Sequence, residues 1–155
     1  MKAYMKTHRG LVREQNEDTI CVAEPLYVLA DGMGGHQAGE VASALAARTL
    51  CETLRDMQPS ADALTRGYLA ANSAVFARQK EDETLSGMGT TMTALWEDQE
   101  YVFVGQIGDS RAYLYRDGKL HQITEDQSMV GEMLRAGAIT EEQARSHPYR
   151  NVITQ

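Results

Sequence analysis

Acidic residues stand at the ends of three apolar stretches of this sequence. Asp31 follows "LYVLA", Asp109 follows "VFVGQIG", and Glu17 and Asp18 come directly before "TICVA". If these stretches are neighbouring strands of a sheet, their carboxylates converge, and several carboxylates repel one another strongly in one pocket. Hard cations such as Mg²⁺ or Mn²⁺ relieve that repulsion and prefer oxygen ligands. The pattern therefore favours a divalent metal site, the alternative being ordinary loop acids, which are common in turns.

The glycines after Asp31, in "DGMGGHQ", allow unusual backbone angles and leave a bare carbonyl able to turn toward a metal. Other glycine-rich or nucleophilic sites do not match. A dinucleotide-binding loop would need glycine where Gln37 stands, and a P-loop would need Gly-Lys-Ser/Thr. Neither cysteine is followed six positions later by the arginine of a thiol phosphatase, and the four histidines form no H-x-x-x-H zinc pair.

Length and charge limit the possible classes of protein. With 155 residues the chain is long enough for one domain with a real core. The net charge of -7 disfavours nucleic acid or an anionic membrane as the main partner. No secretory signal or apolar stretch of membrane-spanning length is present, and Cys21 and Cys51 form no metal or redox spacing. We therefore expect a cytoplasmic protein with reduced thiols.

The elements that must position the acidic residues follow from hydrophobic periodicity and turn signals. Strands are predicted at 19–24, 26–30, 90–97, 101–108, 111–116 and 119–124. Helices are predicted from residue 39 or 40 to about 57, from the N-cap Ser60 to about 80, and in a small insert after 126. Asp117-Gly118 is a strong hairpin signal. This order predicts an α+β layered domain.

The apolar pattern also predicts which sides of the two long helices face the core. The inward positions of the first helix are predicted to be Val41, Ala44, Leu45, Leu50, Leu54 and Met57. Those of the second helix are predicted to be Leu64, Tyr68, Ala71, Val75 and Phe76.

Four segments occur in a specific order: "VREQNEDTICV", "YVLADGMGGHQAGEVAS", "GMGTTMTAL" and "VGQIGDSRAYLYRDGKLHQITEDQSMV". Together they resemble the bacterial branch of the metal-dependent serine/threonine protein phosphatases, the type 2C or PPM family, from about residue 8 to 154. The resemblance implies two antiparallel sheets packed together with helices outside. It also implies a flap at 126–154 and hydrolysis of phosphoserine and phosphothreonine in proteins of a bacterial serine/threonine kinase pathway.

The resemblance also implies roles for individual residues. Asp31 corresponds to the carboxylate that bridges two Mn²⁺ or Mg²⁺ ions, with the Gly32 carbonyl and Glu17 as further ligands. Asp18 corresponds to the acid that holds a metal-bound water, and Asp109 to a ligand of a weaker third ion. In the family a hydroxide bridging the two ions attacks the phosphorus in line.

Arg13 matches the family's phosphate-gripping arginine, a role that suits a planar two-pronged donor. Animal relatives carry a proposed leaving-group acid where this chain has Met33, whose thioether cannot donate a proton. His36 is therefore our hypothesis for the acid, the alternative being a cap on the following helix. Thr90 and Thr91 fit either a phosphate-binding pair or a strand.

Besides Met33, this chain differs from the family in a second way. The family's later strands supply two more aspartates in "DG" and "DN" motifs, whereas this sequence stops at "RNVITQ". We therefore expect residues 1–155 to be an incomplete phosphatase domain that binds Mn²⁺ weakly and turns over slowly, if at all. The alternative is a non-catalytic pseudophosphatase that binds a phosphoprotein or a partner subunit. A further hypothesis is that Arg111 pairs with a nearby acid and holds the "GDSR" turn.

Overall fold

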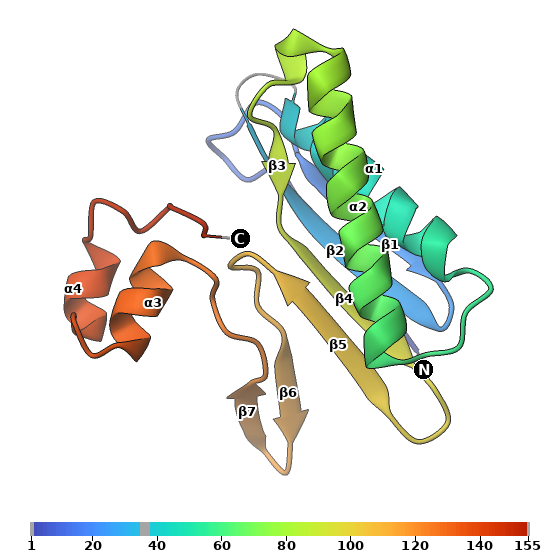
Figure 1. Ribbon diagram of the computed structural model, residues 1–155. Coiled ribbons are helices and arrows are strands. Elements are labelled where there is room, and N and C mark those ends of the chain that lie inside the picture. The colour runs from blue at the N-terminus through green and yellow to red at the C-terminus, as the bar shows by residue number, and fades with distance from the viewer. Residues whose placement is uncertain (1, 35–37, 155) are drawn as a thin grey trace. The chain divides into compact units, whose positions relative to one another are not determined.

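The computed structural model describes residues 2–34 and 38–154 (Figure 1). The chain forms two compact units, Met1–Gly105 and Gln106–Gln155, and each is described by itself. Antiparallel sheets and helices make up the described residues, which confirms the predicted α+β class. No helix among the described residues combines the length and the apolar character needed to cross a membrane.

The first unit is built on an antiparallel sheet whose neighbouring strands follow the order β1-β2-β4-β5, with β3 paired to β2. β5 runs across the boundary between the units. The strands are β1 (Asp18–Ala23), β2 (Leu26–Met33), β3 (Gly89–Thr90), β4 (Met92–Glu97) and β5 (Val102–Ile107). All lie where the sequence predicts strands, and β2 continues past the predicted end to include the "DGM" stretch.

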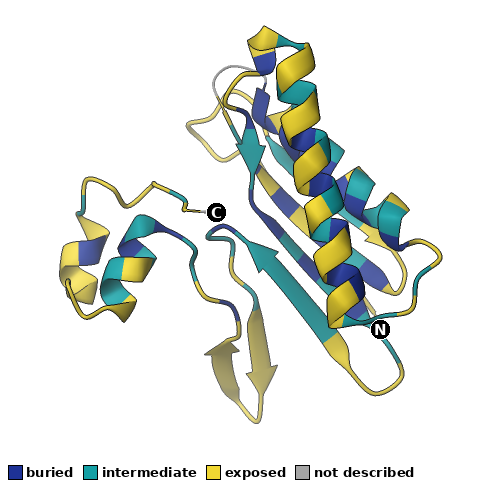
Figure 2. Ribbon diagram, in the orientation of Figure 1, coloured by how far each residue is buried: buried dark blue, intermediate teal, exposed yellow. Residues whose placement is uncertain are grey.

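Burial alternates along β2, as expected for a strand with one covered face. Leu26, Val28 and Ala30 are buried, whereas Leu29 and Asp31 are exposed (Figure 2). The helix α1 (Ala38–Leu54) packs against β1 and β2 and therefore covers the buried face. Asp31 consequently lies on the face turned away from α1.

The second long helix, α2 (Ala61–Glu81), packs on α1. It begins as predicted, because the Ser60 hydroxyl accepts a hydrogen bond from the backbone N–H of Ala63 at 3.2 Å. Tyr68 reaches the sheet, where its hydroxyl donates to the carbonyl oxygen of Met92 at 3.2 Å. A short 3₁₀ helix, η1 (Glu83–Leu85), then leads to β3.

The buried side of α1 agrees with the prediction only in part. Leu50 and Leu54 are buried as predicted, whereas Val41 and Leu45 are half-buried and Ala44 is exposed. The other buried positions are Ala38, Gly39, Ala42, Ser43, Ala46 and Ala47. Small side chains on this face let the helix backbone lie close to the sheet, a contact that a search for large apolar residues overlooks. In α2, Phe76 is likewise 55% exposed rather than buried.

The second unit contains the hairpin of β6 (Tyr113–Arg116) and β7 (Lys119–Gln122). Asp117 and Gly118 join the strands with positive φ angles of 51° and 73°, as a two-residue hairpin turn requires. Two short helices follow, α3 (Met129–Arg135) and α4 (Glu141–Arg145). Both lie within residues 126–154, and the role of this segment as a flap stays a prediction.

Candidate functional site

The backbone of Glu17 is fixed between the sheet and α1. Its carbonyl oxygen accepts a hydrogen bond from the N–H of Gly32 at 3.1 Å and another from the Ser43 hydroxyl at 2.6 Å. Ser43 is fully buried, and its Oγ also lies 2.9 Å from Oγ1 of Thr19. These bonds tie the start of β1 to the "DG" end of β2 and to the first turns of α1.

The side chain of Glu17 lies against the N-terminal end of α1. A Cβ atom placed on Gly39 would be 2.7 Å from Cδ of Glu17 and 2.9 Å from each carboxylate oxygen. Only glycine leaves room for the carboxylate in this position. The helix N-terminus also favours a negative charge there, because its unpaired N–H groups carry partial positive charge.

Gly32 is required for a similar reason. A Cβ atom on Gly32 would collide with the carbonyl oxygen of Gly39 and would lie 2.7 Å from the carbonyl oxygen of Glu17. Gly32 lies within β2 and is not among the described glycines with positive φ. The expectation of an unusual backbone angle is therefore wrong for Gly32, which is glycine because the backbones of β1 and α1 approach it closely.

Asp18 and Asp31 lie directly opposite each other in the β1–β2 pair. Directly opposed residues project from the same face of a sheet, where two like charges destabilise the pair. The carboxylate of Asp18 accepts a hydrogen bond from the Thr7 hydroxyl at 2.5 Å. Asn16 supports Thr7 by donating to its hydroxyl oxygen at 2.8 Å. This end of the hairpin therefore concentrates negative charge on one face.

Thr90 and Thr91 hold the backbone of Asp31. The carbonyl oxygen of Asp31 accepts hydrogen bonds from the N–H of Thr91 at 2.9 Å and from the Thr90 hydroxyl at 3.0 Å. The N–H of Asp31 donates to the hydroxyl oxygen of Thr91 at 3.2 Å. Thr91 is buried. The sequence alone did not predict that Thr90 and Thr91 support the backbone of Asp31. The adjacent hydroxyl residues in "GTT" were the only signal for this role.

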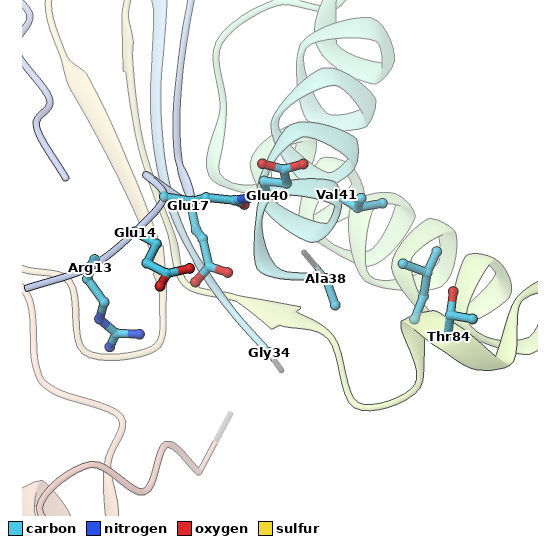
Figure 3. Close-up of a pocket in the computed structure, with 10 residues that line it drawn as sticks. Arg13, Glu14, Glu17, Gly34, Ala38, Glu40, Val41 and Thr84 are labelled. Atoms are coloured by element: carbon cyan, nitrogen blue, oxygen red, sulfur yellow. The ribbon is translucent and has the colours of Figure 1, made fainter. Parts of the chain in front are cut away.

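A cavity of about 630 Å³ opens beside the start of α1 (Figure 3). Arg13 and Glu17, two of the predicted site residues, both line it. Glu14 and Glu40 also line it and were not predicted to belong to the site. One guanidinium thus shares this space with three carboxylates, a balance of charge that favours the entry of cations.

The predicted site residues are only partly brought together. Glu17, Asp18, Asp31 and Gly32 gather at one end of the β1–β2 hairpin. Among residues 2–34 and 38–154, however, no three histidine, cysteine or acidic side chains are placed to hold one metal ion. Asp109 belongs to the second unit. The predicted acid His36 lies outside the described residues.

Comparison with known proteins shows to which family the chain belongs. Residues 9–154 match the sequence profile described as Protein phosphatase 2C. The chain belongs to the protein phosphatase 2C family. Over 151 residues it is 46% identical to the serine/threonine protein phosphatase PstP of Mycobacterium tuberculosis, covering 96% of this chain and 29% of that protein. It is 38% identical to the serine/threonine phosphatase stp of Listeria monocytogenes, covering 99% of this chain and 65% of that one.

Solved structures of the family agree with the fold. A crystal structure of M. tuberculosis PstP/Ppp superposes with a TM-score of 0.86 at 44% identity, covering 97% of this chain and 65% of that one. The PstP catalytic domain in complex with two manganese ions superposes with a TM-score of 0.81, also at 44% identity, covering 90% of this chain and 61% of that one. This protein phosphatase 2C chain thus spans less than two thirds of these relatives.

The donor chemistry at the hairpin end fits a divalent metal of this family. Carboxylates and a backbone carbonyl are the hard oxygen ligands that Mn²⁺ and Mg²⁺ accept. A cation would also relieve the repulsion between the opposed carboxylates of Asp18 and Asp31. Because no three histidine, cysteine or acidic side chains converge among the described residues, the carboxylates at this end do not form a metal-binding cluster by themselves.

In the second unit, Arg111 pairs with Asp126, which confirms the hypothesis that it pairs with a nearby acid. Its Nε and Nη2 atoms donate to the two carboxylate oxygens of Asp126 at 2.8 and 2.5 Å. These hydrogen bonds are the main reason that the pKa of Arg111 is raised. Gly108 and Gln127 form two more hydrogen bonds. The N–H of Gly108 donates to Oε1 of Gln127 at 2.8 Å, and the backbone N–H of Gln127 donates to the carbonyl oxygen of Gly108 at 3.0 Å. The turn that carries Asp109 is thereby tied to the start of the 126–154 segment.

Proposed function

We propose that this chain carries part of the catalytic centre of a metal-dependent serine/threonine protein phosphatase of cytoplasmic signalling, acting on phosphoproteins of a bacterial kinase pathway. The observation that carries the proposal is the placement of Glu17, Asp18, Asp31 and Gly32 at one end of the β1–β2 hairpin, in a chain of the protein phosphatase 2C family. Arg13 and Glu17 line one cavity beside them, large enough to admit a phosphorylated side chain.

In this proposal Asp31, Glu17 and the carbonyl oxygen of Gly32 would hold two ions, Mn²⁺ or Mg²⁺, and Asp109 would hold a third. When bound, such ions polarise a phosphoryl group and lower the pKa of a water molecule that can attack it. Asp18 orients that water through its carboxylate.

The remaining steps belong to groups that contact the substrate. Arg13 grips the phosphoryl oxygens with its two-pronged guanidinium. His36 donates a proton to the oxygen of the departing serine or threonine, whose alkoxide is a poor leaving group. Residues 126–154 form a flap that affects the choice of substrate.

The second candidate function is a non-catalytic pseudophosphatase module. It is favoured by one observation, the lack of three convergent metal-binding side chains among the described residues. Such a module would use the same fold to bind a phosphoprotein or a partner subunit.

A calorimetric titration with Mn²⁺ followed by a phosphothreonine-peptide assay tests the two functions. The phosphatase is expected to take up Mn²⁺ weakly and to release phosphate slowly in the presence of Mn²⁺. Asp31→Asn and Glu17→Gln should each reduce metal affinity by about 10-fold or more. Glu24→Gln is the matched control, because Glu24 is an exposed acid at the opposite end of the same hairpin. No uptake of Mn²⁺ and no phosphate release would instead support the pseudophosphatase.

A further inference from the structure

Two cysteines that are distant in the sequence meet in the first unit. Cys21 lies on β1 and Cys51 lies on α1, 30 positions later, and their Sγ atoms are 2.8 Å apart. Both are free thiols and both are half-buried. Because α1 packs directly on β1, the two sulfur atoms are held together by the core contact between these elements.

A cavity adjoins one of the two cysteines. Cys51 lines a second cavity of about 440 Å³, together with Glu24, Arg55 and Trp96. This cavity lies at the turn end of the β1–β2 hairpin, whereas Glu17 and Asp31 lie at its other end. The cysteine pair is therefore separate from the candidate phosphatase site.

The two sulfur atoms are not chemically equivalent. Burial and the hydrogen bond with Cys21 raise the pKa of the Cys51 thiol to about 12, so Cys51 keeps its proton at neutral pH. Because the thiolate is the reactive form of cysteine, a thiol that keeps its proton is unsuited to the first attack, which we therefore assign to the other member of the pair, Cys21. Cys51 is then correctly placed to react in the second step.

We propose that Cys21 and Cys51 form a redox pair that hydrogen peroxide converts into a disulfide joining β1 to α1. The Cys21 thiolate attacks one peroxide oxygen, the O–O bond breaks, and Cys21 becomes a sulfenic acid while hydroxide leaves. Cys51 gives its proton to that hydroxide, and its sulfur attacks the sulfur of Cys21. The sulfenic oxygen departs as hydroxide and takes up the proton that Cys21 first lost. Two thiols and one peroxide thus yield one disulfide and two water molecules.

The bond would constrain the elements that place Glu17. The loop from Cys21 to Cys51 contains Asp31, Gly32 and most of α1. A disulfide across this loop restricts the unfolded chain. We therefore expect the oxidised protein to melt about 5–10 °C higher than the reduced protein.

Intact mass measurement tests the proposal on the folded chain after reduction, peroxide treatment and removal of excess reagent. The expected product is a monomer that has lost two hydrogen atoms, has no thiol left to alkylate, and yields one linked peptide pair containing Cys21 and Cys51. Its melting temperature should rise, and dithiothreitol should restore the original value. Monomers that gain oxygen atoms, disulfide-linked dimers, or two thiols that remain alkylatable would each overturn the proposal.

Two single variants check the order of attack. With Cys51→Ser, the sulfenic acid has no partner, so dimedone should label Cys21 and peroxide should leave the melting temperature unchanged. With Cys21→Ser, the proton retained by Cys51 should make labelling at Cys51 at least about 10-fold slower. Equal labelling rates of the two variants would refute Cys21 as the attacking sulfur.

Discussion

The contact between Gly39 and the carboxylate of Glu17 allows the proposed metal binding to be changed separately from folding. Gly39→Ala adds one methyl group at the start of α1, 2.7 Å from Cδ of Glu17. Carbon atoms in contact are normally about 3.5–4.0 Å apart, so the carboxylate must move by about 1 Å. Metal sites accept deviations of only about 0.2 Å in their ligand distances. Glu17 could therefore no longer act as the proposed ligand from its present position.

We expect Gly39→Ala to lower the affinity for Mn²⁺ by about 10–100-fold, the usual effect of disturbing a residue that supports a ligand. The free energy of unfolding should not fall by a comparable amount. Alanine is favoured over glycine in helices by up to about 1 kcal/mol, and the atom that must move is the end of a flexible side chain. Calorimetric Mn²⁺ titration and urea unfolding, carried out on the same preparations, measure the two quantities.

Gly67→Ala is the matched control, because it makes the same substitution inside α2. There the new Cβ would lie 2.6 Å from Cδ1 of Leu50, in the contact between the two helices. We expect it to destabilise the protein by about 1–3 kcal/mol through overpacking while Mn²⁺ affinity stays unchanged. Gly39→Ala should thus mainly lower the affinity for Mn²⁺, whereas Gly67→Ala should mainly lower the stability.

A double-mutant cycle shows whether Gly39→Ala acts through Glu17. In a Glu17→Ala background there is no carboxylate to displace, so Gly39→Ala should have no further effect on metal affinity. Wild-type affinity in Gly39→Ala, or an additive loss in the double variant, would refute the reasoning.

Three other changes test the fold. Gly32→Ala should cost about 3 kcal/mol or more in urea unfolding, because its Cβ would collide with the backbone carbonyl of Gly39, and a smaller cost would contradict the close approach. Ser60→Ala should cost about 1 kcal/mol through loss of the N-cap, whereas an unchanged midpoint would argue against the cap. Hydrogen bonds from Thr84 lower the pKa of Asp82, so its contribution to stability is present above its unfolded pKa and is lost as the pH falls through the folded pKa. Asp82→Asn should therefore flatten the acid side of the stability–pH curve, and a curve of unchanged shape would count against a stabilising role of these hydrogen bonds.

Local signals were sufficient for much of the fold. Ser60 caps α2 because its hydroxyl needs only the N–H groups of the next turn. Asp117-Gly118 forms the hairpin turn because the two residues tolerate the positive φ angles that it demands. Hydrophobic patterning predicted the strand positions and placed Glu17 and Asp31 at strand ends as candidates for the site. Arg13 was added by the resemblance to the family.

Only the tertiary structure decided which distant groups meet. The buried face of α1 consists mainly of small residues. Helix periodicity with large apolar side chains therefore found Leu50 and Leu54 but missed the small residues that make up the rest of this face. The roles of Gly32 and Gly39 depend on backbone and side-chain atoms of Glu17, 15 and 22 positions away, which no local preference encodes. Cys21 and Cys51 lack any redox spacing in sequence, yet the packing of α1 on β1 brings their sulfur atoms together. Sequence spacing specifies local conformation, whereas such contacts arise only when separate elements are packed against each other.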